Sequence, residues 1–312
     1  ISGNISTGIE YNDAHALVMT EIVILSGKGG TGKTSLSAAL ATINHQTVVA
    51  DCDVDAANLY LILQPENYVG EKFLTGHKAV IDYSSCDQCG ICIDYCRFDA
   101  IAYVNGRVTI SETACDGCKL CSRVCPSQSI TMVPGDKSYW YIGNYRNGKL
   151  IHARLAPGEE NSGKLVNVVR EQARKTAEET GWETLIIDGP PGTGCPVIST
   201  LTGVDKTIIV TEPTRSGFHD LKRIVELTNT FNIPTYIVVN KYDLNENMTD
   251  QILTWCSDAG IPVVGKIPFD PQIVEAMLQC KSIVEWAPET QAAKEIHAIY
   301  QQVVNNGITL TA

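Results

Sequence analysis

Apolar residues along the chain fall into short continuous runs that alternate with segments of helical spacing. Continuous apolar runs are typical of strands buried on both faces, and strand–helix alternation is typical of a parallel sheet covered by helices on both sides. The pattern therefore predicts an α/β fold with a doubly wound, mostly parallel sheet. Its expected strands are 21–25, 47–50, 184–188, 207–211, 235–240 and 261–264.

The alternation is interrupted in the first half of the chain. Between residues 77 and 136 helical spacing disappears, cysteines are frequent, and only short strands are expected, at 79–83 and 108–110. We interpret residues 77–136 as a small inserted α+β domain. The larger domain would then consist of residues 19–76 and 137–312.

Residues typical of turns and helix caps predict the elements that follow this insertion. Arg146-Asn147-Gly148 separates two strand-like segments, 138–142 and 149–155, and predicts a hairpin. A helix capped near residues 161–163 is expected to follow it. Residues 1–18 are expected to be an extension outside the fold.

A glycine-rich loop joins the first predicted strand to the first predicted helix. It matches the pattern G-x-x-x-x-G-K-S/T, in which backbone N–H groups close around phosphate oxygens at a helix N-terminus. Lys33 would neutralise the β and γ oxygens, and the Thr34 hydroxyl would bind Mg²⁺. ATP or ADP with Mg²⁺ is the expected ligand, the alternative being a turn without a ligand. The expected contacts are Gly27, Lys28, Gly29, Gly30, Thr31, Gly32, Lys33, Thr34 and Ser35.

Two further predicted strands end in aspartates. Residues 47–50 lead into Asp51 and Asp53, and residues 184–187 lead into Asp188. Carboxylates at the carboxyl ends of parallel strands, next to a phosphate site, suit Mg²⁺ binding and the positioning of water. An aspartate that ends an apolar strand is the Walker B arrangement, so Asp188 is expected to bind Mg²⁺. An acidic turn without a ligand is the alternative for the first pair.

Eight of the twelve cysteines form an internal repeat. The spacing C-x₂-C-x₂-C-x₃-C recurs 29 residues later, and it is the bacterial ferredoxin run, in which the fourth cysteine ligates the other cluster. We therefore predict two 4Fe-4S clusters; zinc is the alternative, which the 2-2-3 spacing disfavours. The expected ligands are Cys86, Cys89, Cys92 and Cys125 for cluster 1 and Cys115, Cys118, Cys121 and Cys96 for cluster 2.

The two cysteine runs differ immediately after their last cysteine. Cys125 is followed by Pro126, as in the ferredoxin pattern, whereas Cys96 is followed by Arg97. Arginine has the backbone N–H that proline lacks and adds a positive charge, and both favour a reduced cluster. The two clusters are therefore expected to differ in potential.

Composition and charge exclude several classes of function. The net charge is −11 and the pI is near 5.0, and basic residues do not cluster outside the phosphate loop, so no nucleic-acid partner is expected. No apolar stretch approaches the ~18 residues of a membrane span, and no secretory signal is found, so a cytoplasmic protein is expected. The terminal helix, with Ile296, Ile299, Tyr300 and Val303 on one face, lacks the basic residues of a membrane-surface helix. No direct membrane anchor is expected.

A second lysine in the loop, Lys28, makes this segment read K-G-G-T-G-K-T. It resembles the deviant Walker A loop of MinD, ParA, the Mrp-type ATPases and the nitrogenase iron protein. The segment D-G-P-P-G-T-G at 188–194 resembles switch II of the Mrp-type ATPases. This resemblance implies that Lys28 crosses a dimer interface to the partner's nucleotide, that Asp51 supports the metal and that Asp53 orients the attacking water. Lys28, Lys33 and Asp53 are thus the expected catalytic residues.

The resemblance also covers the base side of the site and the chain as a whole. Asn240 and Pro268 would contact the adenine. From Met19 onward the chain resembles MinD-superfamily P-loop ATPases that carry an inserted ferredoxin domain. This implies a slow, partner-stimulated ATPase that forms a homodimer, or a heterodimer with a similar ATPase, and works with a redox or metal-cluster protein.

Three functions remain open from the sequence. ATP binding and hydrolysis would gate electron transfer through the clusters, or the protein would assemble or carry metal clusters, or it would be a MinD/ParA-like positioning ATPase with a redox sensor. Cys195 lies seven residues after Asp188, as does a cluster-binding cysteine of the nitrogenase iron protein. Because no second cysteine lies between Cys125 and Cys195, a structural role is favoured over an intersubunit cluster. Cys256 and Cys280 are expected to be buried in helices.

Overall fold

The computed structural model describes residues 19–157 and 162–305, so the expected extension 1–18 and the start of the expected cap at 161–163 lie outside the described residues. A nine-stranded sheet has the order β11-β10-β9-β1-β8-β2-β7-β6-β3 and is parallel from β11 to β7. The predicted α/β fold with a mostly parallel sheet is confirmed. Its strands are β1 (Thr20–Ser26), β2 (Thr47–Asp51), β3 (Glu66–Ile81), β6 (Ile130–Tyr145), β7 (Gly148–Arg154), β8 (Thr184–Pro191), β9 (Lys206–Thr211), β10 (Thr235–Asn240) and β11 (Val263–Ile267).

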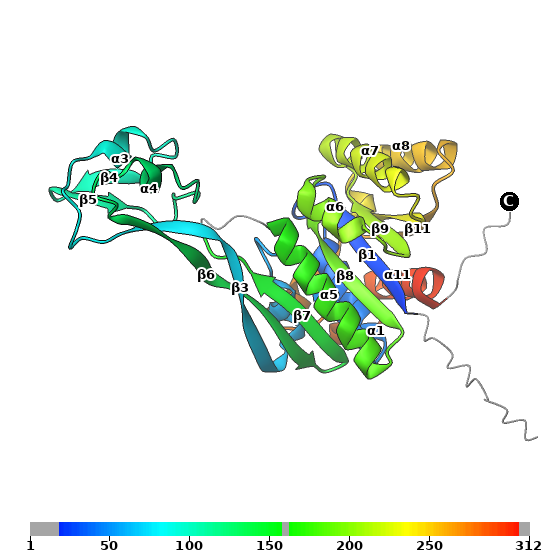
Figure 1. Cartoon of the computed structure of the whole chain (residues 1–312). Helices are drawn as coiled ribbons and strands as arrows, with labels where there is room; N and C mark the ends of the chain where they lie inside the picture. The colour runs from blue at the N-terminus through cyan, green and yellow to red at the C-terminus, as the bar shows by residue number, and fades with distance from the viewer. Residues whose placement is uncertain (1–18, 158–161, 306–312) are drawn as a thin grey trace, which may run out of the picture.

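Helices cover both faces of this sheet (Figure 1). The alternation of side chains along β1 explains why both faces must be covered: Ile22 and Ile24 enter one core, and Val23 and Leu25 enter the other, all fully buried. Helices α1, α2, α10 and α11 pack into the first core and α5 to α8 into the second. The helices are α1 (Lys33–Ile43), α2 (Leu59–Leu63), α5 (Ser162–Thr180), α6 (Cys195–Leu201), α7 (Arg215–Thr230), α8 (Glu246–Asp258), α9 (Gln272–Leu278), α10 (Ile283–Trp286) and α11 (Gln291–Tyr300), with 3₁₀ and π turns at Tyr242–Leu244 and Gln301–Asn305.

A two-stranded arm extends the sheet away from this body (Figure 1). Strands β3 and β6 are 16 residues each and pair antiparallel from Glu66 opposite Asn144 to Ile81 opposite Ile130. Strand β6 also pairs with β7, but only from Tyr139 onward. The strands expected at 79–83 and 138–142 were therefore wrong in extent, because residues 79–81 are the end of the long strand β3 and residues 138–142 lie inside the long strand β6. We call residues 73–81 and 130–138 the arm.

A small unit lies at the tip of the arm (Figure 1). It contains α3 (Ile91–Asp94), the hairpin of β4 (Ile101–Val104) and β5 (Arg107–Ile110), and α4 (Leu120–Val124). The strand predicted at 108–110 is β5. The predicted ends of the insertion, residues 77 and 136, fall within β3 and β6, and its independence as a domain stays a prediction. A separate core of buried residues holds the unit together; it contains Ala79, Ile81, Cys92, Ala100, Ile101, Val108, Cys115 and Ile130.

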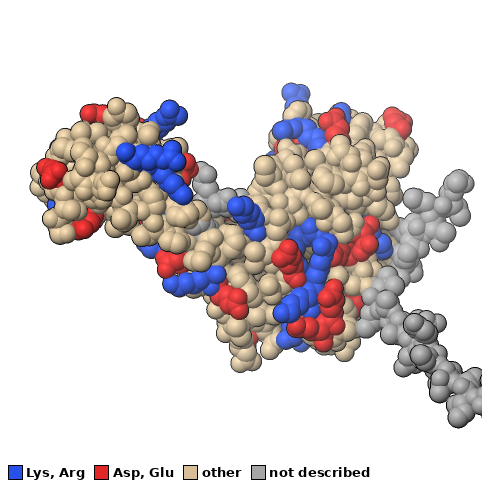
Figure 2. All heavy atoms as spheres, viewed as in Figure 1, with Lys and Arg blue, Asp and Glu red and all other residues tan. Residues whose placement is uncertain are grey.

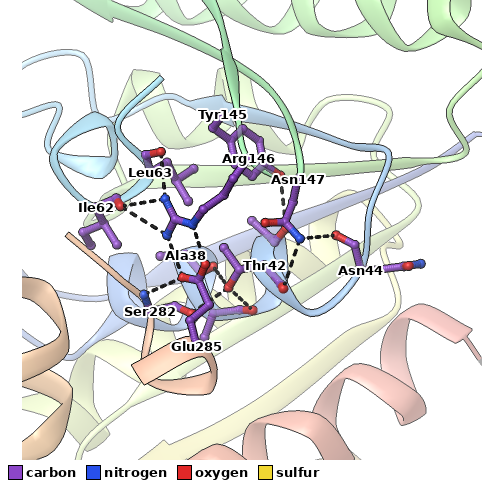
Figure 3. A network of polar contacts seen from close by, with 12 residues as sticks. Ala38, Thr42, Asn44, Ile62, Leu63, Tyr145, Arg146, Asn147, Ser282 and Glu285 are labelled. Atoms are coloured by element: carbon purple, nitrogen blue, oxygen red, sulfur yellow. Dashed lines mark hydrogen bonds and ion pairs between the residues drawn. The ribbon is translucent and has the colours of Figure 1, made fainter. Parts of the chain in front are cut away.

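The turn at the other end of β6 attaches the arm to the body (Figure 3). The predicted hairpin is confirmed, since Tyr145 pairs with Gly148 across the turn. Arg146 forms an ion pair with Glu285 of α10 and donates to the Leu63 carbonyl at the end of α2, at 3.0 Å. The Tyr145 hydroxyl donates to the Ala41 carbonyl of α1 at 3.0 Å. The arm is thus fixed to the helix that begins at the phosphate loop.

The surface bears charges of both signs. On the face shown in Figure 2, acidic and basic side chains are interleaved over the body, and a group of Lys and Arg side chains lies on the tip unit. This view shows no broad basic face of the kind that binds nucleic acid. Among the residues described, no helix is long and apolar enough to cross a membrane.

Candidate functional site

The phosphate loop lies between β1 and α1, at the carboxyl edge of the sheet. Gly32 precedes α1 with a φ of 93°, and a Cβ there would stand 2.2 Å from Asn240 Nδ2. A Cβ on Gly27 would stand 2.1 Å from the Cβ of Asp220. Both positions therefore require glycine, the first for its backbone conformation and for space, the second for space alone.

Lys33, Thr34 and Asp188 meet at the start of α1. Lys33 Nζ lies 2.9 Å from Asp188 Oδ1, and the Thr34 hydroxyl donates to Asp188 Oδ2 at 2.9 Å. Burial lowers the pKa of Lys33, but the Asp188 carboxylate outweighs it and leaves that pKa raised. Ser37, which our sequence analysis missed, donates to Asp188 Oδ1 at 2.6 Å. Its position one helical turn after Lys33 was the available signal.

The aspartates of the first acidic segment lie beside this group. Asp51 is fully buried on β2, directly opposite Asp188 in the pairing of β2 with β8. Burial, and then the Asp188 carboxylate, raise the pKa of Asp51 to about 7. Its oxygens accept hydrogen bonds from the backbone N–H of Leu59, at 3.1 Å, and of Asp53, at 3.2 Å. Asp53 is half-exposed, and partial burial raises its pKa, with Lys33 opposing.

Lys28 points away from the phosphate loop toward the end of β9. Its Nζ lies 2.6 Å from Glu212 Oε1 and donates to the Ser216 hydroxyl at 3.0 Å. Glu212 also lies 3.4 Å from Lys241 Nζ, which in turn donates to the Gly30 carbonyl at 3.1 Å. Sequence reasoning missed Glu212 and Lys241. The signal available was that both residues directly follow strands whose carboxyl ends meet the loop.

An apolar hollow next to the loop contains the predicted base-side residues. It encloses about 730 Å³, including open solvent at its mouth, and is lined by Ser35, Asn240, Pro268 and Phe269 among others. Asn240 Nδ2 donates to the Thr31 carbonyl at 2.7 Å, while its oxygen accepts from the Lys241 N–H at 3.0 Å. Asn240 thus braces the phosphate loop at the rim of the hollow.

The eight repeated cysteines line two cavities in the tip unit. Each cavity combines three cysteines of one run with the fourth cysteine of the other. One is lined by Cys86, Cys89, Cys92 and Cys125, and the other by Cys96, Cys115, Cys118 and Cys121. These are the two sets expected from the sequence. Among the described residues, no three His, Cys, Asp or Glu side chains lie close enough together to share a single metal ion.

The backbone around these cavities is closely packed. Gly117, between two of the cysteines, has a φ of 71°, and a Cβ there would stand 2.0 Å from the His77 carbonyl oxygen. Burial raises the pKa of the Cys121 thiol to about 11. The Cys125 thiol lies 3.6 Å from the Ser127 hydroxyl. Burial raises the pKa of Cys125, but hydrogen bonds with Ser127 and Ser129 outweigh burial and leave that pKa lowered. We call the cavity of Cys86 the distal cavity and that of Cys115 the proximal cavity.

The four remaining cysteines lie apart from these cavities. Cys52 and Cys256 are fully buried, and burial raises the pKa of both thiols. The expectation that Cys280 is buried in a helix was wrong: it follows α9 with a φ of 55° and is half-exposed. Cys195 is exposed at the first position of α6.

Known proteins resemble this chain over most of its length. An uncharacterized protein of Methanocaldococcus jannaschii is 40% identical over 233 residues, covering 73% of this chain and 80% of the relative. An iron-sulfur cluster carrier protein of Pyrococcus abyssi is 25% identical over 309 residues, covering 91% and 85%. The structure of the septum site-determining protein MinD with Mg-ADP from Pyrococcus horikoshii superposes with a TM-score of 0.56 at 20% identity, covering 92% and 96%, and so shares the fold. Residues 22–283 match the CobQ/CobB/MinD/ParA nucleotide binding domain. The chain therefore belongs to the CobQ/CobB/MinD/ParA family of nucleotide-binding proteins.

Proposed function

We propose that this P-loop ATPase couples its nucleotide state to electron transfer through two 4Fe-4S clusters in the tip unit. The observation that carries the proposal is the sorting of eight cysteines into two cavities, each with three cysteines of one run and the fourth of the other. This exchange is the ligation pattern of two-cluster bacterial ferredoxins.

The cysteine cavities fit such clusters chemically. Each has four thiols, the number that a 4Fe-4S cluster requires, and the proximal cavity is otherwise mostly apolar. A cluster is larger than a single ion, so its ligands stand farther apart than the donors of a zinc site would. When bound, such clusters supply reversible one-electron transfer. The chain's own role is to hold the thiols, limit solvent access and place nearby charges.

The body would bind and hydrolyse ATP with residues of the phosphate loop and the strand ends. The loop amides and Lys33 bind phosphate oxygens; Thr34, Asp51 and Asp188 bind or support Mg²⁺. Asp188 contacts both Lys33 and Thr34, so these three side chains would act together at the phosphates and Mg²⁺. Asp53 orients the attacking water, and Lys28 reaches the nucleotide of a second ATPase subunit, whether identical or merely similar.

The coupling would pass through α2. Asp51 accepts from the N–H of Leu59, the first residue of α2, and Arg146 in the β6–β7 turn donates to the carbonyl of Leu63, the last residue of α2. Strand β3 begins three residues after Leu63. A change in the position of Asp51 on nucleotide binding would therefore be passed through α2 to β3 and to the β6–β7 turn, the strands from which the arm extends. Differential contacts of this kind are what allow a ligand to shift a conformational equilibrium.

Iron analysis and redox titration test this proposal. The anaerobically purified protein should contain about eight irons and eight acid-labile sulfides per chain. The midpoint potential of at least one cluster, followed by electron paramagnetic resonance, should differ between ATP-bound and ADP-bound protein, with Asp53→Asn used to prevent turnover. Stoichiometric zinc without sulfide would refute the cluster assignment. Full iron content with potentials indifferent to nucleotide would refute the coupling.

A second candidate is delivery of iron-sulfur clusters to other proteins. It is favoured by relatives such as the P. abyssi protein, whose name is iron-sulfur cluster carrier protein. A carrier must release its cluster, whereas an electron-transfer protein retains it. Mixing the loaded protein with an apo-ferredoxin and ATP distinguishes the two: iron should stay with this chain if the clusters conduct electrons, and move if they are cargo.

A further inference from the structure

Lys78 is a buried lysine beside the proximal cavity. It lies on the arm strand β3, its exposed fraction is 8%, and its Nζ donates to the backbone carbonyl of Cys115 at 2.7 Å. Cys115 is one of the four cysteines that line the cavity. The ammonium group therefore contacts the backbone of a residue whose own thiol would ligate a cluster.

The internal repeat places a second basic residue at the corresponding position. Arg107 lies 29 residues after Lys78, the interval that separates the two cysteine runs. Its guanidinium does not take the corresponding contact; it is exposed and its Cζ lies 3.5 Å from the centre of the Tyr83 ring. A buried charge is screened by solvent much less than an exposed one. The repeat is thus symmetric in its cysteines and asymmetric in its buried charge.

The two cavities also differ in their distance along the arm. The proximal cavity is lined by Ala79 and Met132, which pair across the arm, and the distal cavity by Ile81 and Ile130, the last pair before the tip. Because β3 runs from the body to the tip, the cavity that Lys78 serves contacts the arm closer to the body.

We propose that Lys78 raises the potential of the proximal cluster and so adds to the difference expected from Arg97, which follows Cys96 of the same cavity. This inference rests on the proposed function. Adding one electron to a cluster adds one negative charge, and a nearby buried ammonium group stabilises that charge. A low-potential one-electron donor would therefore reduce the cluster in the proximal cavity in preference to the distal one. Lys78 acts as a fixed charge, and the cysteines alone hold the iron.

Three variants and a redox titration test the assignment. Lys78→Gln removes the charge but keeps a hydrogen-bond donor, Lys78→Arg keeps the charge, and Arg107→Gln removes the corresponding exposed charge. Each protein is titrated anaerobically with dithionite and followed by electron paramagnetic resonance. Lys78→Gln should make reduction of one cluster about tenfold less favourable, a shift of about 59 mV for one electron. Lys78→Arg and Arg107→Gln should leave both potentials close to those of the parent.

The shifted step must belong to the proximal cavity. It should be the step that Cys118→Ser also alters, and not the one altered by Cys89→Ser. Unchanged potentials in Lys78→Gln, an equal shift in Arg107→Gln, or loss of iron from Lys78→Gln would each overturn the inference while leaving the proposed function intact. A parent protein without iron and sulfide would instead refute the proposed function and, with it, this inference.

Discussion

Lys28 lies in the phosphate loop, as its sequence motif predicts, but it contacts Glu212, which the motif does not predict. Its ion pair with Glu212 joins the phosphate loop to the end of β9 within one chain. If Lys28 must reach a second subunit, this ion pair has to break first. The pair is partly exposed, so its contribution to stability is small and it is easily exchanged.

We expect Lys28→Ala to keep nucleotide binding, because Lys33 and the loop amides remain, but to lose ATP-dependent dimerisation and hydrolysis by about 10²-fold or more. Glu212→Gln should have the opposite effect on assembly and increase the dimer fraction at a given ATP concentration. Sedimentation of both variants with ATP measures this. Normal turnover by Lys28→Ala would show that Lys28 has no part in hydrolysis.

Asp53 allows a separation of binding from chemistry. Asp53→Asn should bind ATP with nearly unchanged affinity while hydrolysis falls by roughly 10²-fold, because a neutral amide holds the attacking water less strongly than a carboxylate does. Isothermal titration and a phosphate-release assay measure the two quantities. An equal loss in both would show that Asp53 supports the loop and has no part in orienting water.

Asp51 predicts a pH dependence in the ligand-free protein. Its pKa is raised to about 7 in the folded chain, so between roughly pH 4 and pH 7 the folded state binds more protons there than the unfolded state does. The contribution of Asp51 to the free energy of unfolding therefore falls as pH rises through this window. Asp51→Asn should flatten the dependence of the free energy of unfolding on pH, measured by urea unfolding between about pH 4 and pH 7. An unchanged slope would assign the titration to other groups.

Among the elements, the turn at the root of the arm offers a test of how the arm is held. Arg146→Ala removes the ion pair to Glu285 and the bond to the Leu63 carbonyl, and its cost should be about 1 kcal/mol because the pair is partly exposed. Lys72→Ala is the control. Its ion pair with Asp136, which joins β3 to β6, is exposed to solvent, so no change in stability is expected. Urea denaturation measures both. The proposed coupling further requires Arg146→Ala to reduce the effect of nucleotide on the cluster potentials.

The elements also show what the sequence allowed one to predict. Strands β1, β2, β8, β9 and β10 were predictable because they are buried on both faces and are therefore continuously apolar. The middle of the arm was not, because the chain around Gly76 and Pro134 is exposed and is interrupted by these residues and Gly135, so neither alternation nor a continuous run develops. The Lys28–Glu212 pair joins residues 184 positions apart, and only the adjacency of β1 and β9 brings them together.

In the whole molecule, nucleotide and electrons are linked if they share one conformational equilibrium. The ATP affinity of the oxidised protein should then differ from that of the reduced protein by the same free energy by which ATP shifts the cluster potential. Anaerobic titration of Asp53→Asn in both redox states measures the two sides. Equal affinities in both states, together with a cluster potential that ATP does not shift, would show that the nucleotide and the clusters do not share a conformational equilibrium.

The arm itself is a lever. Beyond the point where β7 stops supporting it, nine residues on each strand separate the body from the tip, which at about 3.3 Å per residue is a reach of roughly 30 Å. A rotation of about 10° at the base of this span, where Lys72 pairs with Tyr139, would carry the tip through roughly 5 Å at that reach. Under the proposed coupling, small rearrangements in the body would thus become, at the far end, the difference between meeting a redox partner and missing it.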